Sequence, residues 1–479
     1  MTSAVPTQLP CPVKAQLPNR ASAIAIYRHG PATPLSYAEL DQAISALNLP
    51  QIPSGEVLAV ILDEPLSLII WLLACLRQGI IFCPIDPRLT EPEIQQRCRH
   101  AGIKYYVSAN KYKVAGLTKV SPRVTPEAIP EAKPEAIPEQ PKPGIATEPP
   151  LHFDLNQPAT LVFTSGSSGS AKAAQHSLGN HYYSALGSQL LIPFTSNDCW
   201  LLSLPLYHIG GIALVFRALF AGGSIALGSR ATQHDLACFP VTHASLVPTQ
   251  VYRLLQHAND LGGLSLRYLL VGGAALTNTL CQQLAEQPFT SFASYGLTEM
   301  SSQVATVKIT PHTVQPLSYE ILPYRQVNIE QQGIMLSGPC LFMGYRQHGR
   351  LIAPPLPFNS QDSGRITGQT LQVTGRLDNM FIAGGENVQP EQVEQALANF
   401  AMVKQAIVVP IDDPEFGQVA VAYIDWQANA APTRLAQLCR EQLPPWQRPK
   451  HFLAWPQWPG LKPNRKALAH QAEQILTKR

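Results

Sequence analysis

The sequence contains few charged residues, and its cysteines show no regular spacing. Only 14% of its 479 residues are Asp, Glu, Lys or Arg, and the formal net charge is +3. No block of Lys and Arg is interleaved with aromatic residues, which argues against a nucleic-acid partner. The nine cysteines form no C-x-x-C pair and no regular pattern, which favours reduced thiols over a disulfide framework, and no zinc set can be assembled from them. We therefore expect reduced thiols and a cytoplasmic protein.

Long hydrophobic runs are also missing. The most apolar segment, residues 66–76, is too short to cross a bilayer and predicts a buried helix. The N-terminal residues MTSAVPTQLPCPVK lack a basic start followed by an apolar stretch, so we expect no signal peptide. We accordingly expect no integral membrane span.

What the sequence does contain is enough apolar residue for more than one core. Hydrophobic residues make up 45% of the chain, and its length exceeds that of a single domain. Residues 57–85 read as strand, helix and strand, and the pattern recurs at 200–206, 212–223, 244–249 and 266–273. Apolar strands about one helix apart indicate a parallel sheet covered on both faces. The fold class predicted is a large, doubly wound α/β domain.

Two further segments set the domain organisation. Residues 121–150 repeat a P-E-A unit and are rich in proline, so we expect an exposed, extended insertion within the first domain. From residue 375 the pattern changes to strand, amphipathic helix, two strands, helix and a basic tail, which suffices for a small α+β domain. We predict domains at 1–374 and 375–479.

One short stretch is typical of a phosphate-binding turn. Residues 160–176 read TLVFTSGSSGSAKAAQH, in which a strand-like run leads into small residues and a lysine. Glycines let backbone N–H groups approach an anion, hydroxyls add donors, and a lysine adds charge. The spacing differs from the Walker motif, because Gly166 and Gly169 are three apart and no Ser or Thr follows Lys172. A flexible serine–glycine turn explains this stretch alone equally well.

Three later stretches decide between these alternatives. They are SYGLTEM at 294–300, the pair QDSGR and TGRLDN between 361 and 379, and LKPNRKAL at 461–468. Each has a plain explanation as solvated polar residues, but their order resembles that of the adenylate-forming superfamily. This superfamily includes acyl-CoA and aryl-CoA ligases, luciferases and peptide-synthetase adenylation domains. The resemblance runs from residue 35 to the C-terminus and omits only the proline-rich tract.

The resemblance implies a fold in which a small C-terminal α+β lid moves against the large domain, with ATP, Mg²⁺ and coenzyme A as ligands. Glu299 would ligate the metal and Thr298 would bond the α-phosphate. Lys462 would bridge the substrate carboxylate and the α-phosphate, and Asp378 would be the hinge. The remaining implied residues hold ATP (Thr164, Ser165, Gly166, Ser167, Ser168, Gly169, Lys172, Gly272, Gly273, Tyr295, Gly296, Asp362 and Arg376) or admit coenzyme A (Gly384 and Gly385).

The chain departs from the superfamily pattern at several positions. Ala171 and Ala173 flank Lys172 where the superfamily carries proline and glycine, and we expect the loop to work with altered rigidity. The ribose-binding aspartate follows S-Q in place of T-G. Leu461 replaces the glycine before the tail lysine; Lys466 is the alternative to Lys462, although only Lys462 keeps the K-x-x-R-x-x-L frame.

An isolated charge suggests the substrate class. Arg217 is the only charged residue in IALVFRALF, and a buried arginine is costly unless it meets an anion. The functional interpretation is a counter-charge for a second carboxylate of the substrate, aided by Ser302 and Gly273. The alternatives are an arginine that reaches solvent or pairs with an internal acid. His208 either closes the acyl pocket or is a structural histidine at a helix start.

Within the superfamily, four stretches resemble the ligases that activate an aromatic dicarboxylic acid for menaquinone or phylloquinone biosynthesis. They are PLYHIGG with Arg217, LVPTQVYRLL, YGLTEMSSQVAT and LDNMFIAGGENVQPEQVE, although those ligases tend to have serine at the position of Gly210. We expect adenylation of the acid with release of pyrophosphate, then displacement of AMP by the coenzyme A thiol. Alternatives are another aryl- or acyl-CoA ligase, an adenylation domain that loads a carrier protein, or a non-catalytic binding protein. A homodimer is an open alternative to a monomer.

Overall fold

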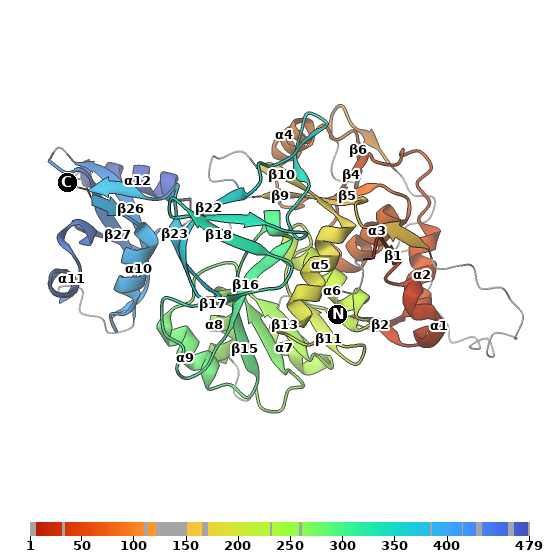
Figure 1. Cartoon of the computed structure of the whole chain (residues 1–479), viewed down its shortest axis with the longest axis horizontal. Coiled ribbons are helices and arrows are strands. Elements are labelled where there is room, and N and C mark those ends of the chain that lie inside the picture. The colour runs from red at the N-terminus through yellow and green to blue at the C-terminus, as the bar shows by residue number, and fades with distance from the viewer. Residues whose placement is uncertain are drawn as a thin grey trace, which may run out of the picture.

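The computed structural model describes residues 6–30, 34–109, 114–120, 151–164, 171–229, 232–257, 261–383, 386–413, 415–427, 434–457 and 464–477. The proline-rich tract 121–150 lies outside these ranges. Within them, two large sheets, a smaller sheet and the helices between and around them form the molecule (Figure 1).

The first large sheet contains the predicted strand–helix–strand unit. β4 (Val57–Ile61) and β5 (Ile81–Pro84) are parallel neighbours joined by α3 (Pro65–Arg77), which confirms that prediction. In the described residues the sheet order is β21 (Arg350–Ile352), β20 (Gly344–Gln347), β10 (Lys172–Ser177), β9 (Pro158–Thr164), β5, β4, β6 (Tyr105–Ser108) and β7 (Thr118–Lys119).

The second large sheet has a parallel centre and antiparallel flanks. Strands β2, β12, β11, β13, β14 and β15 run parallel, so their carboxyl ends meet at one edge. The order in the described residues is β18 (Gln326–Glu330), β19 (Gly333–Ser337), β22 (Phe358–Thr367), β23 (Thr370–Arg376), β17 (Tyr319–Ile321), β16 (Ser302–Lys308), β15 (Thr290–Leu297), β14 (Tyr268–Val271), β13 (His243–Leu246), β11 (Cys199–Leu202), β12 (Ser224–Leu227), β2 (Ile24–Tyr27) and β3 (Leu35–Ser36).

A layer of helices lies between these two sheets. Residues 66–76 of α3 are all buried, as expected for a helix that is apolar on every face, and Glu64 caps its first turn. β4 shows the layering, because Leu58 and Val60 face the central helices while Val57, Ala59 and Ile61 face the outer helix α4. The helices of the large domain are α1 (Leu17–Arg20), α2 (Tyr37–Ala46), α3, α4 (Glu91–Ala101), α5 (Leu178–Gln189), α6 (Ile209–Phe220), α7 (Thr232–Cys238), α8 (Pro248–His257) and α9 (Asn278–Ala285).

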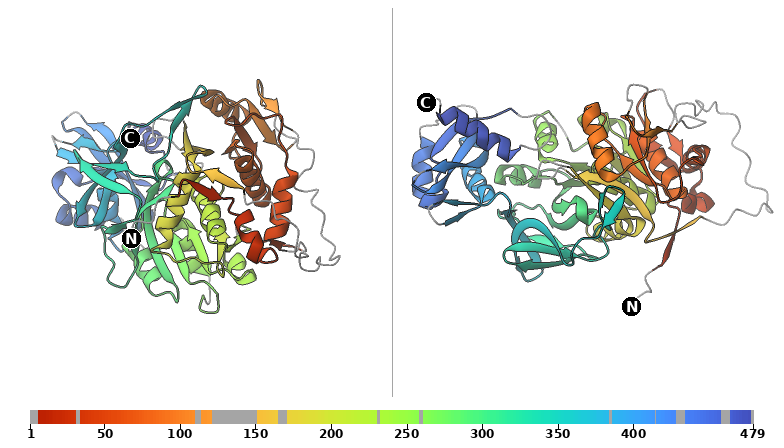
Figure 2. Two further views of the ribbon diagram at one scale, coloured as in Figure 1. Left: turned by 45° about the vertical axis from the view of Figure 1, so that its right-hand side comes forward. Right: turned by 90° about the horizontal axis from the view of Figure 1, so that it is seen from above.

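The C-terminal part has cores of its own, which contain residues from 381 to 476 only. It contacts the large domain through Asn278 and Asn399, with 2.6 Å between side-chain amide atoms, and through Gln315 and Gln395 at 2.8 Å. Figure 2 shows it at one end of the molecule. The predicted class, a large α/β body with a small α+β part, is confirmed. Its elements are β24 (Phe381–Ala383), β25 (Glu386–Val388), α10 (Pro390–Ala398), β26 (Val403–Asp413), β27 (Gly417–Trp426), α11 (Leu435–Gln442), β28 (His451–Ala454) and α12 (Arg465–Thr477).

The remaining elements are short: two strands, β1 (Gln8–Pro10) and β8 (His152–Asp154), pair with each other. No helix in the described ranges is long and apolar enough to span a membrane.

Candidate active site

The predicted phosphate loop connects two antiparallel strands. Thr164 ends β9, Lys172 begins β10, and the two residues lie opposite each other in the strand register. The loop residues between them that were predicted to hold phosphate lie outside the described residues. The methyl group of Ala173 is buried against Phe163, so this departure from the superfamily pattern fills the core behind the loop. The described strands therefore hold both ends of the loop in place.

A tyrosine connects the lysine of this loop to the acidic turn. Lys172 Nζ lies 5.2 Å from the centre of the Tyr345 ring, and Tyr345 Oη donates to Glu299 Oε1 at 2.6 Å. Burial, together with the Glu299 charge, raises the pKa of Tyr345, so the hydroxyl remains a donor at neutral pH. Tyr345 is not among the residues predicted from the sequence. The available signal was the tyrosine that ends GPCLFMGY.

Glu299 has the properties of a magnesium ligand. Its second carboxylate oxygen, Oε2, makes no hydrogen bond within the described residues, and the side chain is partly exposed. Mg²⁺ prefers hard oxygen ligands and is often held by one or two carboxylates together with substrate phosphates. The donor at this position therefore fits the ion.

Thr298 and Glu299 project from a short 3-10 turn, residues Thr298–Met300, after β15. Gly296 is required before this turn, because a Cβ there would lie 2.0 Å from the carbonyl oxygen of Ser302. The carbonyl of Thr298 is 2.7 Å from Nε2 of His176, a second residue that the sequence analysis missed. Burial lowers the pKa of His176 to about 4, so the ring is neutral at pH 7 and donates through Nε2.

Each oxygen of the predicted ribose-binding carboxylate accepts one hydrogen bond from a neighbouring side chain, which leaves acceptor capacity on both. Tyr295 Oη donates to Asp362 Oδ2 at 2.6 Å, and Arg376 Nη1 donates to Asp362 Oδ1 at 3.0 Å. Burial raises the pKa of Asp362, while the Tyr295 hydrogen bond and the Arg376 charge oppose that shift. Arg376 also binds the predicted hinge residue Asp378 in bidentate fashion, with N···O distances of 2.9 and 3.0 Å. The structure thus joins four of the predicted residues in one network.

The glycine pair after β14 lies at the same edge of the sheet as the acidic turn. Gly273 has φ +85°, a left-handed conformation that favours glycine, and a Cβ on Gly272 would meet Ser294 Oγ at 2.6 Å. A larger residue at Gly272 would therefore collide with β15.

Arg217 is buried among apolar residues of α6. Arg217 is only 2% exposed, which excludes the alternative that its side chain reaches solvent. Nη2 lies 3.4 Å from Ser302 Oγ, the guanidinium lies 5.7 Å from the centre of the Trp200 ring, and Nε has no partner. No acidic side chain pairs with it in the described part of the chain, so the internal-acid alternative is not observed there either.

Burial, reinforced by the charge of Arg325, lowers the pKa of Arg217 to about 9, which leaves the group protonated at neutral pH. A buried cation without a counter-ion favours the binding of an anion. His208, by contrast, is exposed at the start of α6 and packs against the Tyr207 ring at 4.9 Å. Gly210 follows, and a Cβ there would meet Leu204 Cδ1 at 3.0 Å.

The predicted tail lysine Lys462 and the Gly384–Gly385 loop lie outside the described residues. The rest of the K-x-x-R-x-x-L frame is a structural anchor. Arg465 Nη2 donates to Glu394 Oε2 at 2.8 Å, and Leu468 is buried against β26 and β27. Arg465 and Leu468 of this frame therefore hold α12 against the rest of the C-terminal part.

Fold and site together define a class: a two-part α/β enzyme of the adenylate-forming type. The family model described as AMP-binding enzyme matches residues 13–346, and the model described as AMP-binding enzyme C-terminal domain matches residues 392–461. The chain belongs to the AMP-binding enzyme family.

Several relatives carry the same name. A 2-succinylbenzoate–CoA ligase of Escherichia coli is 31% identical over 91% of this chain and 90% of its own length. One from Salmonella typhimurium is 37% identical over 65% of this chain and 69% of its own length.

Among solved structures, wild-type E. coli MenE with a bound phenylether-linked analogue of OSB-AMS has a TM-score of 0.79 and 28% identity, over 98% of this chain and all of that one. MenE from Bacillus subtilis in complex with ATP and magnesium ion has a TM-score of 0.80 and 26% identity, over 96% of this chain and all of that one.

Proposed function

We propose that this chain is an ATP- and Mg²⁺-dependent 2-succinylbenzoate–CoA ligase. The substrate carboxylate attacks the α-phosphate of ATP, which forms an acyl-adenylate and releases pyrophosphate. The thiol of coenzyme A then attacks the acyl carbon, which forms the thioester and releases AMP. Because the mixed anhydride is already activated, no nucleophile from the protein is needed.

The observation that supports this proposal most directly is the burial of Arg217 without an acidic partner in the described residues. 2-Succinylbenzoate has two carboxylates, one on the succinyl chain and one on the aromatic ring. We assign the succinyl carboxylate to adenylation and the ring carboxylate to the Arg217 guanidinium, with Ser302 beside it. A ligase for apolar acids would bury an unpaired cation with no compensating gain. The named ligases among the relatives support the same substrate.

The other residues are assigned by their position. Glu299 would hold Mg²⁺, which would offset negative charge on the phosphates of ATP. Thr298 would donate to the α-phosphate, and the His176 contact to its carbonyl orients that turn. Lys172 would contact the β- and γ-phosphates, while Asp362 would accept from the ribose hydroxyls. Lys462 would stabilise the charge that grows as the carboxylate attacks.

Two half-reactions at one site require a rearrangement. We propose that residues 375–479 move as a unit about Asp378, so that Lys462 serves adenylation and the Gly384–Gly385 loop serves thioester formation. The separate cores of this part support such a motion, since each consists of residues from this part alone. A cytoplasmic location is supported by nine free cysteines, eight of which are buried.

A panel of carboxylic acids, assayed for AMP and pyrophosphate with coenzyme A present, tests the proposal. We expect 2-succinylbenzoate to give the highest kcat/KM, with AMP formed in equal amount to the thioester. AMP formation that is faster with benzoate or a fatty acid would favour another aryl- or acyl-CoA ligase. Adenylation without thioester formation would favour a carrier-loading domain, and ligand binding without pyrophosphate release would favour a non-catalytic protein. ADP as the product would contradict the whole class.

A further inference from the structure

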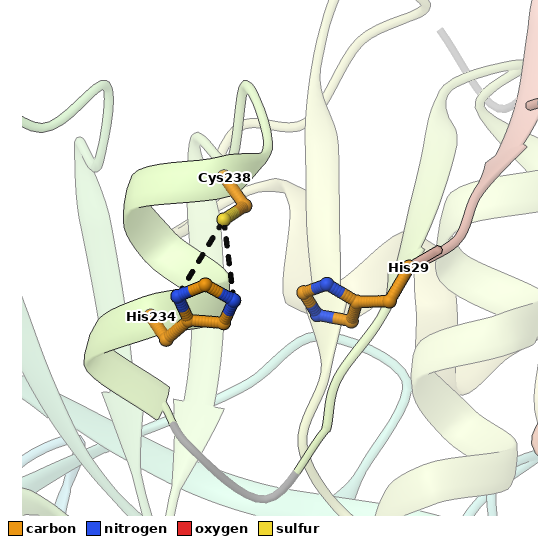
Figure 3. Close-up of side chains that lie close together, drawn as sticks. All are labelled: His29, His234 and Cys238. Carbon is orange, nitrogen blue, oxygen red and sulfur yellow. Dashed lines mark hydrogen bonds between the residues drawn. The ribbon is translucent and has the colours of Figure 1, made fainter. Parts of the chain in front are cut away.

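A second group of ligand-type side chains lies at the same carboxyl edge of the parallel strands as the acidic turn, but on the β2 side of the sheet, several strands away from β15. Figure 3 shows His29, which follows β2, and His234 and Cys238, which belong to α7. One potential ligand atom from each of the three lies within 4.8 Å of the others. β2 and β12 are parallel neighbours, so the turn after β2 and the helix after β12 meet at the same sheet edge. The three residues thus converge although 205 positions separate His29 from His234.

The spacing on α7 suits the capture of a metal ion. His234 and Cys238 are four residues apart, which places them on one face of the helix, and Cys238 Sγ lies 3.5 Å from His234 Nε2. Cys238 is also exposed, whereas the other eight cysteines are buried. Buried cysteines are explained by packing, but an exposed one beside two imidazoles is not.

The third ligand is held by a buried carboxylate. His29 Nε2 lies 2.6 Å from Asp235 Oδ1, and Asp235 is 2% exposed. Asp235 also accepts hydrogen bonds from Ser229, at 3.0 Å from the backbone nitrogen and 2.7 Å from the hydroxyl. A neutral histidine that donates one ring N–H to a carboxylate keeps a lone pair on the other nitrogen. Carboxylates support metal-binding histidines in this way.

We propose that His29, His234 and Cys238 bind one transition-metal ion of the zinc class, with the fourth position left to water. Imidazole nitrogen and thiolate are preferred ligands of Zn²⁺, whereas the Mg²⁺ used by the enzyme prefers oxygen. Binding releases the thiol proton of Cys238 to solvent. This site is separate from the proposed catalytic residues, and its existence does not depend on the proposed reaction.

One side chain must turn to complete the site. The rings of His29 and His234 are stacked, with centroids 5.4 Å apart and an angle of 13° between their planes. Lone pairs lie in the ring plane, so the exposed His234 ring must rotate about its side-chain torsions to point at the same ion as His29. The bound ion then links α7 to the segment after β2.

The test uses the full-length chain without an affinity tag, dialysed against Zn²⁺ in the absence of ATP and coenzyme A, because both chelate metals. We expect one Zn²⁺ per chain. Cys238→Ser and His234→Ala should each weaken the affinity for Zn²⁺ about tenfold or more, because mutation of a residue that merely supports a metal ligand already lowers metal affinity by about that factor. His312→Ala, which removes an exposed histidine elsewhere, is the matched control and should bind as wild type.

Two further readouts separate a built site from weak surface binding. Co²⁺ should give a thiolate-to-metal charge-transfer band in wild type that Cys238→Ser abolishes, and Zn²⁺ should raise the melting temperature of wild type but not of that variant. Equal melting temperatures of the metal-free proteins would show that the variants fold. Absence of stoichiometric Zn²⁺ in wild type, or wild-type affinity in Cys238→Ser, would overturn the proposal.

Discussion

Replacement of the buried arginine in α6 should separate substrate recognition from folding. Arg217→Met keeps a side chain of similar length, so the packing against Trp200 is largely retained while the charge is lost. In wild type the guanidinium is 2% exposed and lacks an acidic partner within the described residues. The ring carboxylate of the substrate would supply that partner.

The size of the effect follows from the burial. Truncation of one member of a buried, hydrogen-bonded charge pair costs about 2–5 kcal/mol, which corresponds to a loss of roughly 30-fold to several thousand-fold in kcat/KM. An analogue without the ring carboxylate should lose less than about threefold, because it makes no ion pair with Arg217. The free protein should be at least as stable as wild type, because the variant removes an uncompensated buried cation.

The assay is pyrophosphate release with 2-succinylbenzoate and with its monocarboxylic analogue, on wild type, Arg217→Met and the exposed-arginine control Arg253→Met. Thermal unfolding of the three proteins is measured in parallel. Equal losses of kcat/KM with the two acids would refute the role of Arg217 in substrate recognition and would indicate a structural role. A melting temperature well below that of wild type would refute the argument that its charge is uncompensated in the free protein.

Two further predictions concern the site, and a third concerns a buried histidine of β13. Tyr345→Phe keeps the ring beside Lys172 but removes the hydrogen bond to Glu299. The Mg²⁺ concentration that gives half-maximal pyrophosphate release should therefore rise roughly 2–10-fold. An unchanged Mg²⁺ titration would contradict this role of Tyr345. Lys462→Ala should lose adenylation yet still convert a presynthesised acyl-adenylate to the thioester, whereas full adenylation by this variant would show that the tail lysine is wrongly assigned. Burial lowers the pKa of His243 from 6.5 to about 4, so between these pH values only the unfolded state gains the proton, and the free energy of unfolding falls as pH falls. His243→Gln should reduce the slope of the unfolding free energy against pH, measured by urea unfolding, by about 1.4 kcal/mol per pH unit. The control His312→Ala should leave that slope unchanged.

The sequence predicted most of the fold because its strands are apolar on both faces. Residues 57–61 and 81–84 are fully buried strands on either side of an apolar helix in the sequence, a pattern typical of a parallel sheet covered on both faces. The amphipathic helix predicted after residue 375 is α10, which begins at Pro390, a residue type that fits the first turn of a helix. The burial of Arg217 was also predictable, because the residues around it leave the helix no polar face.

The contacts within the site were less accessible to sequence reasoning. His176 lies in a stretch that reads as the continuation of the phosphate loop, and its role depends on a carbonyl 122 residues further along the chain. Likewise, the pairing of Asp362 with Arg376 depends on the register of β22 with β23, and its hydrogen bond from Tyr295 connects β22 to β15. Local patterns specify which residue types are present, but such pairings are set by strand order.

The clearest case is the path of the chain between β19 and β22. Both strands belong to the thirteen-stranded sheet, yet the hairpin β20–β21 between them joins the edge of the other large sheet, next to β10. This crossing places Tyr345 opposite Ala174, so that its ring lies beside Lys172 while its hydroxyl reaches Glu299. Lys172 comes from the first sheet and Glu299 follows a strand of the second, so the hairpin is what ties the predicted phosphate loop to the predicted metal ligand. The alanines around Lys172 do not weaken that connection, because Ala173 and Ala174 are buried in the cores on either side of β10. The stiffness with which this loop holds its ligand should therefore depend on Tyr345 more than on the residues that flank the lysine.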